Sequence, residues 1–221
     1  MLQPESLSAL VSTVLTWAPG LILGITLHEA AHAYAAKRCG DNTAYALGRV
    51  TLNPVKHIDP IGTLLLPIVM GVMTAGSFIF GYAKPVPVNF ARLDDPKWDA
   101  VRVAAAGPAA NFVIAVLAVF LLHFAIMLPA MPATLSVQVL VAAIQINVLL
   151  MVFNLLPLLP LDGGRIVHAL LPYEAGRTFA QTERFGFFIV MGLALTGILF
   201  TIIGPIMKAI TLFLIRFAPV G

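Results

Sequence analysis

The chain has 221 residues, of which 60% are hydrophobic and only 10% are charged, and its mean hydropathy is +0.97. A soluble domain carries roughly 25% charged residues, so this chain cannot cover a water-facing surface and is predicted to be an integral membrane protein. The net charge of +3 does not indicate a nucleic-acid partner, because Lys and Arg flank apolar runs and act as topology anchors. Its single cysteine, Cys39, excludes an intrachain disulfide and a cysteine-type zinc site.

The first predicted element is a membrane helix over residues 7–38. Its apolar length is enough for a hydrocarbon core about 30 Å thick at 1.5 Å per residue, and Lys37, Arg38 and Gly40 end it. The apolar run has no Lys or Arg before it and no clear small-residue cleavage site. A removable signal peptide is therefore not expected.

Two short segments after this helix are predicted to be membrane-associated β segments. Residues 43–52 are rich in Thr, Tyr and Val, and residues 83–90 alternate but contain Pro85 and Pro87, which restrict them to a sheet edge. Between the two segments, the apolar run 61–82 has basic loops at both ends. Its Pro and Gly content permits a re-entrant or shallow hairpin if protein covers it, and a membrane span is the alternative.

The second half of the chain is predicted to contain further membrane spans. A short helix is expected to start at Asp162, and a last, short amphipathic helix is expected over residues 205–217. The predicted spans are 101–128, 135–156 and 185–203. The fold class is therefore an all-α polytopic membrane protein with about five to six membrane helices in a single domain, 1–221.

The predicted topology follows from the distribution of Lys and Arg. The loops 37–59, 84–102 and 165–184 are basic, whereas the turn 129–134 has no charge. By the positive-inside tendency, the basic loops face the cytoplasm. The first helix then runs inward, the second long span outward and the third inward.

The run His28-Glu29-Ala30-Ala31-His32 lies inside the first predicted span. On a helix, positions i and i+4 share one face, so both imidazoles can reach one metal ion while Glu29 lies beside them to transfer a proton. The alternative is a pair of buried histidines on a packed helix. The metal site is favoured, because Glu and His are expensive in a bilayer and usually functional there.

A catalytic zinc ion needs a third protein ligand and an open position for water, and depth selects Asp162 for this role. His28 and His32 precede Lys37 by nine and five residues, which places them roughly 7–14 Å below the basic edge. Asp162 lies at the inward end of its span, at a similar depth; its alternative role is an N-cap for the next helix. His123 lies near the outward end of a helix and is interpreted as a core or interface residue.

Three asparagines lie in apolar helices, and a buried amide must be hydrogen-bonded. Helix–helix bonding is one interpretation for all three and is favoured for Asn111 and Asn147. The other is that the amides orient the site or donate to substrate carbonyl groups, a role for which Asn154 and Asn111 are the candidates. His57 and Asp59 are interpreted as part of a polar surface turn, with a contact to the metal as the alternative.

Three motifs, in this order, resemble the site-2 protease family of intramembrane zinc metalloproteases. They are His28-Glu29-Ala-Ala-His32, Gly107-Pro108-Ala-Ala-Asn111 and Asn154-Leu-Leu-Pro157-Leu-Leu-Pro160-Leu-Asp162-Gly163-Gly164. The resemblance covers about residues 20–172. The stretch 47–62 looks like that of the small bacterial members, and no region resembles a PDZ or CBS domain.

The resemblance implies that His28, His32 and Asp162 bind one Zn²⁺ per chain, that Glu29 is the catalytic base, and that Asn154 lies beside the substrate backbone. It implies a catalytic core of three helices and a location in the bacterial inner membrane. The expected partners are the lipid bilayer and a membrane-protein substrate with a transmembrane segment. The three core helices would be 7–38, 101–128 and 135–156.

The leading hypothesis is therefore regulated intramembrane proteolysis with the active site toward the cytoplasm. The segments 43–52 and 83–90 are expected to receive the unwound substrate as an added strand. The first alternative is a non-proteolytic zinc-binding membrane protein, which would not need Glu29. The second is an ion transporter, which would carry ionisable residues along several spans, whereas here they cluster at one depth.

Overall fold

The computed structural model describes residues 4–66, 69–70, 81–127 and 135–216. Four helices in this part of the chain are long and apolar enough to cross a membrane. They belong to α1 (Pro4–Arg38), α4 (Trp98–Met127), α5 (Leu135–Asn154) and α9 (Ile198–Arg216). The prediction of an all-α polytopic membrane protein is confirmed, and most of the run 61–82 lies outside the described residues.

The remaining described elements are short and connect or cover the long helices. Four are α-helices: α2 (Thr43–Ala46), α6 (Asp162–Leu170), α7 (Tyr173–Ala180) and α8 (Glu183–Leu195). The other three are the 3₁₀ turns η1 (Pro54–His57) and η3 (Phe90–Arg92) and the π-helical turn η2 (Pro60–Leu65).

The helices α1, α4 and α5 pack against one another through small residues. A Cβ atom on Gly20 would lie 2.7 Å from Ala143 Cα, and one on Gly24 would lie 2.6 Å from Asn147 Oδ1. Only glycine therefore allows α1 to approach α5 this closely, as is typical of helix pairs in membranes. The three helices form the bundle predicted as the catalytic core.

A second helix layer covers the bundle. Fully or almost fully buried side chains from α4, α5 and α9 form one apolar cluster that includes Ala115, Val148 and Ile203. The outer face of α4, by contrast, exposes large apolar side chains such as Leu117 and Phe124, which is 63% exposed. Such a surface fits hydrocarbon rather than water.

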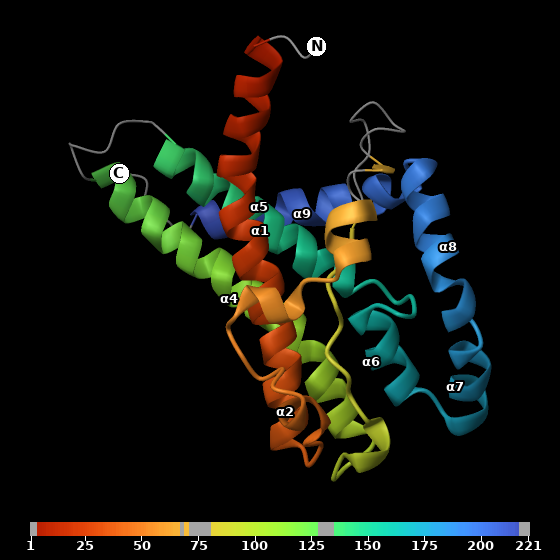
Figure 1. The fold of residues 1–221 in the computed structure, drawn as a ribbon. Helices are drawn as coiled ribbons and strands as arrows, with labels where there is room; N and C mark the ends of the chain where they lie inside the picture. The colour runs from red at the N-terminus through yellow and green to blue at the C-terminus, as the bar shows by residue number, and fades with distance from the viewer. Residues whose placement is uncertain (1–3, 67–68, 71–80, 128–134, 217–221) are drawn as a thin grey trace.

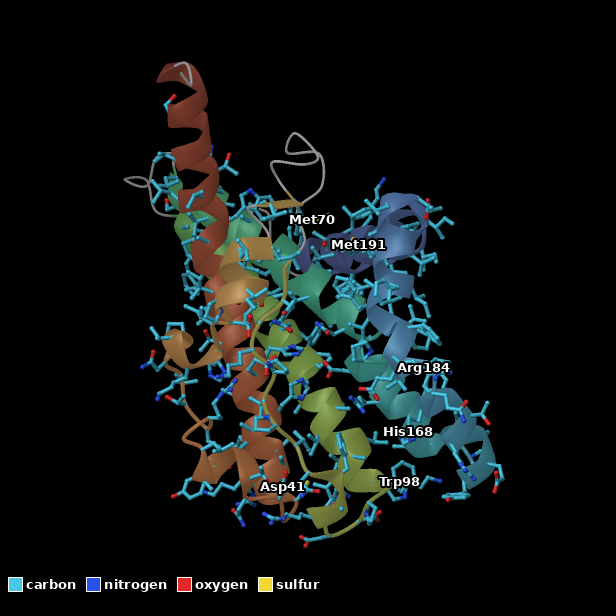
Figure 2. All side chains as sticks on the ribbon, turned by 45° about the vertical axis from the view of Figure 1, so that its right-hand side comes forward. Asp41, Met70, Trp98, His168, Arg184 and Met191 are labelled. Atoms are coloured by element: carbon cyan, nitrogen blue, oxygen red, sulfur yellow. The ribbon has the colours of Figure 1, made fainter. Side chains whose placement is uncertain are left out.

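The relative directions of α1 and α4 can be followed in Figures 1 and 2. In Figure 1, α1 runs the length of the molecule, α4 and α5 cross it, and the chain leading to η3 descends between α1 and α6. Asp41, which follows α1, and Trp98, the first residue of α4, lie at the same end of the molecule (Figure 2). The chain therefore runs along α4 in the direction opposite to α1.

The two predicted β segments are wrong, because the described residues contain no strand. Residues 43–46 form α2, which begins where the Asp41 carboxylate accepts hydrogen bonds from the backbone N–H and the hydroxyl of Thr43. Gly48, with φ +64°, follows the helix. These local hydrogen bonds outweigh the β propensity of the segment, and residues 83–89 have no regular structure.

The predicted boundary between the last two helices is also displaced. The break lies at Gly197, whose φ of +76° is the left-handed conformation that commonly ends a helix. Pro205, predicted to start the last helix, instead lies inside α9. As a result α8 has only 13 residues, about 20 Å of helix, and α9 carries the span.

Candidate metal centre

The structure brings together the three side chains predicted as metal ligands. His28 Nε2 lies 3.0 Å from His32 Nε2, and each of these nitrogens lies 3.3 Å from one oxygen of the Asp162 carboxylate. The histidines project from α1, and Asp162 is the first residue of α6. Among the described residues, this is the one group of three or more side chains spaced to hold a metal ion.

The geometry and chemistry of the three ligands fit Zn²⁺. A tetrahedral zinc ion with bonds of roughly 2.0–2.1 Å separates its ligand atoms by about 3.3–3.4 Å, close to the separations observed. Asp162 Oδ2 is buried without a hydrogen-bond partner in the described part of the chain, as expected for an oxygen reserved for a cation. Two imidazoles and one carboxylate also form a typical catalytic zinc set with one position left open.

Gly107 of α4 keeps the space beside the imidazoles free. A Cβ atom at this position would lie 2.3 Å from His32 Nε2 and 2.6 Å from His28 Nε2. Any larger residue would therefore collide with both ligand atoms or push them apart. The sequence motif contains this glycine, but its role becomes visible only in the packing of α4 against α1.

Both imidazoles are oriented by hydrogen bonds on the side away from the centre. His28 Nδ1 lies 2.7 Å from Asn111 Oδ1, and His32 Nδ1 lies 2.7 Å from the carbonyl oxygen of Val103. Because both oxygens accept, each Nδ1 carries the hydrogen and each Nε2 presents its lone pair to the centre. Such contacts fix the tautomer and the ring orientation of a metal-binding histidine.

A chain of buried amides extends this support into α5. Asn111 Nδ2 donates to Asn147 Oδ1 at 3.0 Å and to the carbonyl of Gly24 at 3.2 Å. Asn147 in turn donates to the carbonyls of Ala143 and Gly20 at 2.9 and 3.3 Å. Both asparagines are fully buried. Asn111 therefore supports His28, and Asn147 links α5 to α1 by hydrogen bonds and also holds Asn111 in place.

Glu29 lies next to His28 on α1 but faces a different part of the chain. Its Oε2 accepts a hydrogen bond of 2.7 Å from the backbone N–H of Val86. Val86 belongs to residues 82–89, which we call the strap; the strap descends between α1 and α6 (Figure 1). Sequence reasoning could not find this contact, since every residue except proline has a backbone N–H.

The remaining predicted site residues form hydrogen bonds with other parts of the described chain rather than with the three candidate ligands. Asn154 ends α5, is half-buried, and donates from Nδ2 to the carbonyl of Leu150 at 2.9 Å. The prediction of a surface position for His57 is wrong: it is 1% exposed, and its Nε2 donates to the carbonyl of Thr51 at 3.0 Å. Asp59 caps η2 through its carboxylate, and neither residue belongs to the metal-ligand group.

Comparison with known proteins identifies relatives over most of the chain. The model of Peptidase family M50 matches residues 17–129 and 125–199. A Bacillus subtilis protein named "Putative zinc metalloprotease YwhC" is 40% identical over 194 residues, which is 86% of this chain and 84% of the relative. No solved structure is significantly similar to the chain.

More distant relatives carry similar names and are longer. "Putative zinc metalloprotease Rip2" of Mycolicibacterium smegmatis is 34% identical, with 80% of this chain aligned to 65% of the relative. "Zinc metalloprotease MJ0392" of Methanocaldococcus jannaschii is 30% identical, with 81% of this chain aligned to 41% of the relative. On these matches the chain belongs to Peptidase family M50, the site-2 protease family of membrane zinc metalloproteases.

Proposed function

We propose that this protein is an intramembrane endopeptidase that hydrolyses peptide bonds in or near the transmembrane segments of membrane-protein substrates. The observation that carries the proposal is the position of Glu29: it lies beside a three-ligand metal group inside a helix long and apolar enough to cross a membrane. A purely structural zinc site would not need this carboxylate. A substrate that itself lies in the membrane accounts for water-consuming chemistry in apolar surroundings.

The chain's own residues divide the chemical work. His28, His32 and Asp162 would hold one Zn²⁺ per chain, which when bound supplies a Lewis acid for water and for the substrate carbonyl. Glu29 accepts the proton of the attacking water and returns it to the leaving amine. Asn154 is proposed to donate a hydrogen bond to the substrate backbone, where an amide can stabilise developing negative charge.

The proposed location is the bacterial inner membrane, with the active site toward the cytoplasm. One end of the molecule carries both the end of α1, with Lys37 and Arg38, and the start of α4, with Arg102. Basic residues at helix ends favour the cytoplasmic side. Water would then reach the centre from the nearby aqueous face rather than across the bilayer.

The test is cleavage of a single-span model substrate by the purified protein in detergent, with the product ends identified by mass spectrometry. Wild type is expected to cut within or near the membrane segment, and Glu29→Gln is expected to retain zinc and lose cleavage. Equal cleavage by both proteins would refute the role of Glu29. Bound zinc without cleavage by wild type would instead favour the non-proteolytic zinc protein.

A further inference from the structure

We propose that the strap, residues 82–89, is a positioning element of the active site, in which the backbone N–H of Val86 holds the Glu29 carboxylate in its working orientation. The inference rests on the proposed function of Glu29 as the proton-transferring base. It assigns a role to a segment without regular structure and to the buried groups that hold it.

The contact between Val86 and Glu29 is specific to one atom on each side. The backbone N–H of Val86 lies 2.7 Å from Glu29 Oε2. Its neighbours Pro85 and Pro87 have no N–H, so this donor is the only one in the run of three. No hydrogen bond within the described part of the chain reaches Glu29 Oε1, which leaves that oxygen for a water molecule.

The strap is held on both sides of Val86 by groups that the metal centre does not use. Before Val86, the N–H of Lys84 donates to the carbonyl of His57 at 2.9 Å, and the Arg49 guanidinium donates to the carbonyl of Lys84 at 2.7 Å. After Val86, the N–H of Asn89 donates to Asp41 Oδ2 at 2.7 Å.

The anchoring side chains are almost inaccessible to solvent. Arg49 is 6% exposed, His57 is 1% exposed and Asp41 is fully buried. Burying a charged group costs free energy unless it is hydrogen-bonded. The Arg49 and Asp41 side chains bond the strap directly, whereas the His57 side chain bonds the carbonyl of Thr51 and its backbone carbonyl accepts from Lys84. These buried residues therefore set the position at which Val86 meets Glu29.

A fixed donor matters because a glutamate side chain is flexible. Hydrogen bonds to a carboxylate are charge-assisted and roughly twice as strong as neutral ones, so one N–H is enough to select an orientation. Holding the base in place before the substrate arrives lowers the entropic cost of reaching the transition state. The strap therefore acts through Glu29 and needs no contact with the reacting atoms.

The direct test compares Val86→Pro with Val86→Ala. Proline removes the N–H and suits an irregular segment already flanked by prolines, whereas alanine keeps the N–H. We expect Val86→Pro to lower kcat about tenfold or more, with KM and bound zinc unchanged, and Val86→Ala to retain most of the activity. Equal activity of the two variants, or an increase in Val86→Pro, would overturn the inference; an increase would make the strap an inhibitor.

A double-mutant cycle shows whether the effect passes through Glu29. Glu29→Asp shortens the side chain so that it no longer reaches Val86. In the Glu29→Asp background, Val86→Pro should lower kcat by less than about twofold, because the effects of substitutions at two coupled residues are not additive. If the two effects multiply, the strap acts by another route.

An independent measurement avoids activity altogether. The exchange rate of the Val86 amide hydrogen should rise in Glu29→Ala, in both zinc-loaded and zinc-free protein, while that of Asn89 stays the same. An unchanged Val86 rate would overturn the inference even if Val86→Pro failed to fold. Wild-type activity in Glu29→Gln would refute the proposed function itself, whereas a negative Val86 result would refute only the role of the strap.

Discussion

The metal centre has two sides that are built in different ways. On the side of α4 and α5, His28 is held by Asn111 and Asn147, two fully buried amides whose hydrogen bonds tie three helices together. On the other side, Glu29 is held by a single backbone N–H from Val86, a half-buried residue in a largely exposed segment without regular structure. The candidate ligands are enclosed by helices, and the proposed base faces the strap.

This difference matches the two tasks of the site. Metal ligands work best when second-layer hydrogen bonds hold them rigidly and exclude solvent. A base that exchanges protons with water and meets a large substrate needs an accessible side. Changes on the enclosed side are therefore expected to remove the metal, whereas changes on the strap side are expected to spare the metal and slow the reaction.

The largest effect is expected from Gly107→Ala, which breaks the enclosed side at its tightest point. The added Cβ would lie 2.3 Å from His32 Nε2, so the ligands must move and bound zinc should fall well below one per chain. A displacement of about 1 Å can cost about a hundredfold in rate. Zinc analysis and a cleavage assay on the same preparation check this.

Gly192→Ala is the matched control, since it is also a glycine inside a helix, α8, but has no atom within 4 Å of the added Cβ. This variant should keep its zinc and activity, and better helix propensity should raise the free energy of unfolding by up to about 1 kcal/mol. Loss of zinc in both variants would show that Gly107 has no special role.

The next largest effects are expected at two asparagines, Asn111 and Asn154, and separate residues that support metal binding from residues that contact the substrate. Asn111→Ala removes the acceptor of His28 and should weaken zinc binding roughly 10–100-fold, as measured by competition with a chelator. Asn154→Ala should leave zinc affinity unchanged and mainly reduce cleavage, because Asn154 is proposed to contact the substrate. The reverse pattern would exchange the roles of the two asparagines.

On the strap side, we expect substitution of Asp41 to have a smaller effect, on the free energy of unfolding and its dependence on pH. Burial alone would raise the pKa of this carboxyl, but hydrogen bonds from Thr43 and from the N–H of Asn89 outweigh it and hold the pKa below its usual range. Because the folded pKa is lower than the unfolded value of about 3.9, the stabilisation is complete above that pH and is lost as the pH falls toward the folded pKa.

Asp41→Asn should therefore lower the free energy of unfolding by roughly 1–2 kcal/mol near neutral pH and remove this acid-dependent loss. Unfolding curves in detergent at neutral pH and below pH 4 measure both quantities. The same loss of stability at low pH in the variant would assign it to other carboxylates.

The smallest effect is expected for a surface pair far less enclosed than the metal centre. Arg165 of α6 and Glu183 of α8 form an ion pair, with side chains 33% and 38% exposed. Arg165→Gln should change the free energy of unfolding by less than about 1 kcal/mol, and high salt should reduce the difference further. A large loss of zinc in this variant would mean that α6 depends on this pair to present Asp162.

The meeting of the three candidate ligands can be predicted from the sequence, because they are side chains with a fixed relation to helices. His28 and His32 are four residues apart on one helix, and Asp162 begins another at the same depth. The groups that hold them are harder to predict. Val103 contributes a carbonyl and Val86 an N–H, which carry no sequence pattern, and Gly107 acts by lacking a side chain.

The fold shows the same division. Long apolar runs predict α1, α4 and α5 to within a few residues, because the bilayer requires helices of that length. The strand prediction for 43–52 fails, since Asp41 binds Thr43 and starts a helical turn instead. The α8–α9 boundary is missed because a left-handed Gly197, not Pro205, ends the helix.

The most direct measurement of the central claim is X-ray absorption at the zinc edge, on wild type and on His32→Ala. Two imidazole nitrogens and additional oxygen donors are predicted for wild type, falling to one imidazole in the variant. Two results would contradict the site. One is a sulfur donor, which the single cysteine, Cys39, or a methionine would have to supply. The other is an unchanged number of imidazole ligands in the variant. The same wild-type sample should cleave its membrane substrate, and Glu29→Gln should show the same zinc spectrum without cleavage.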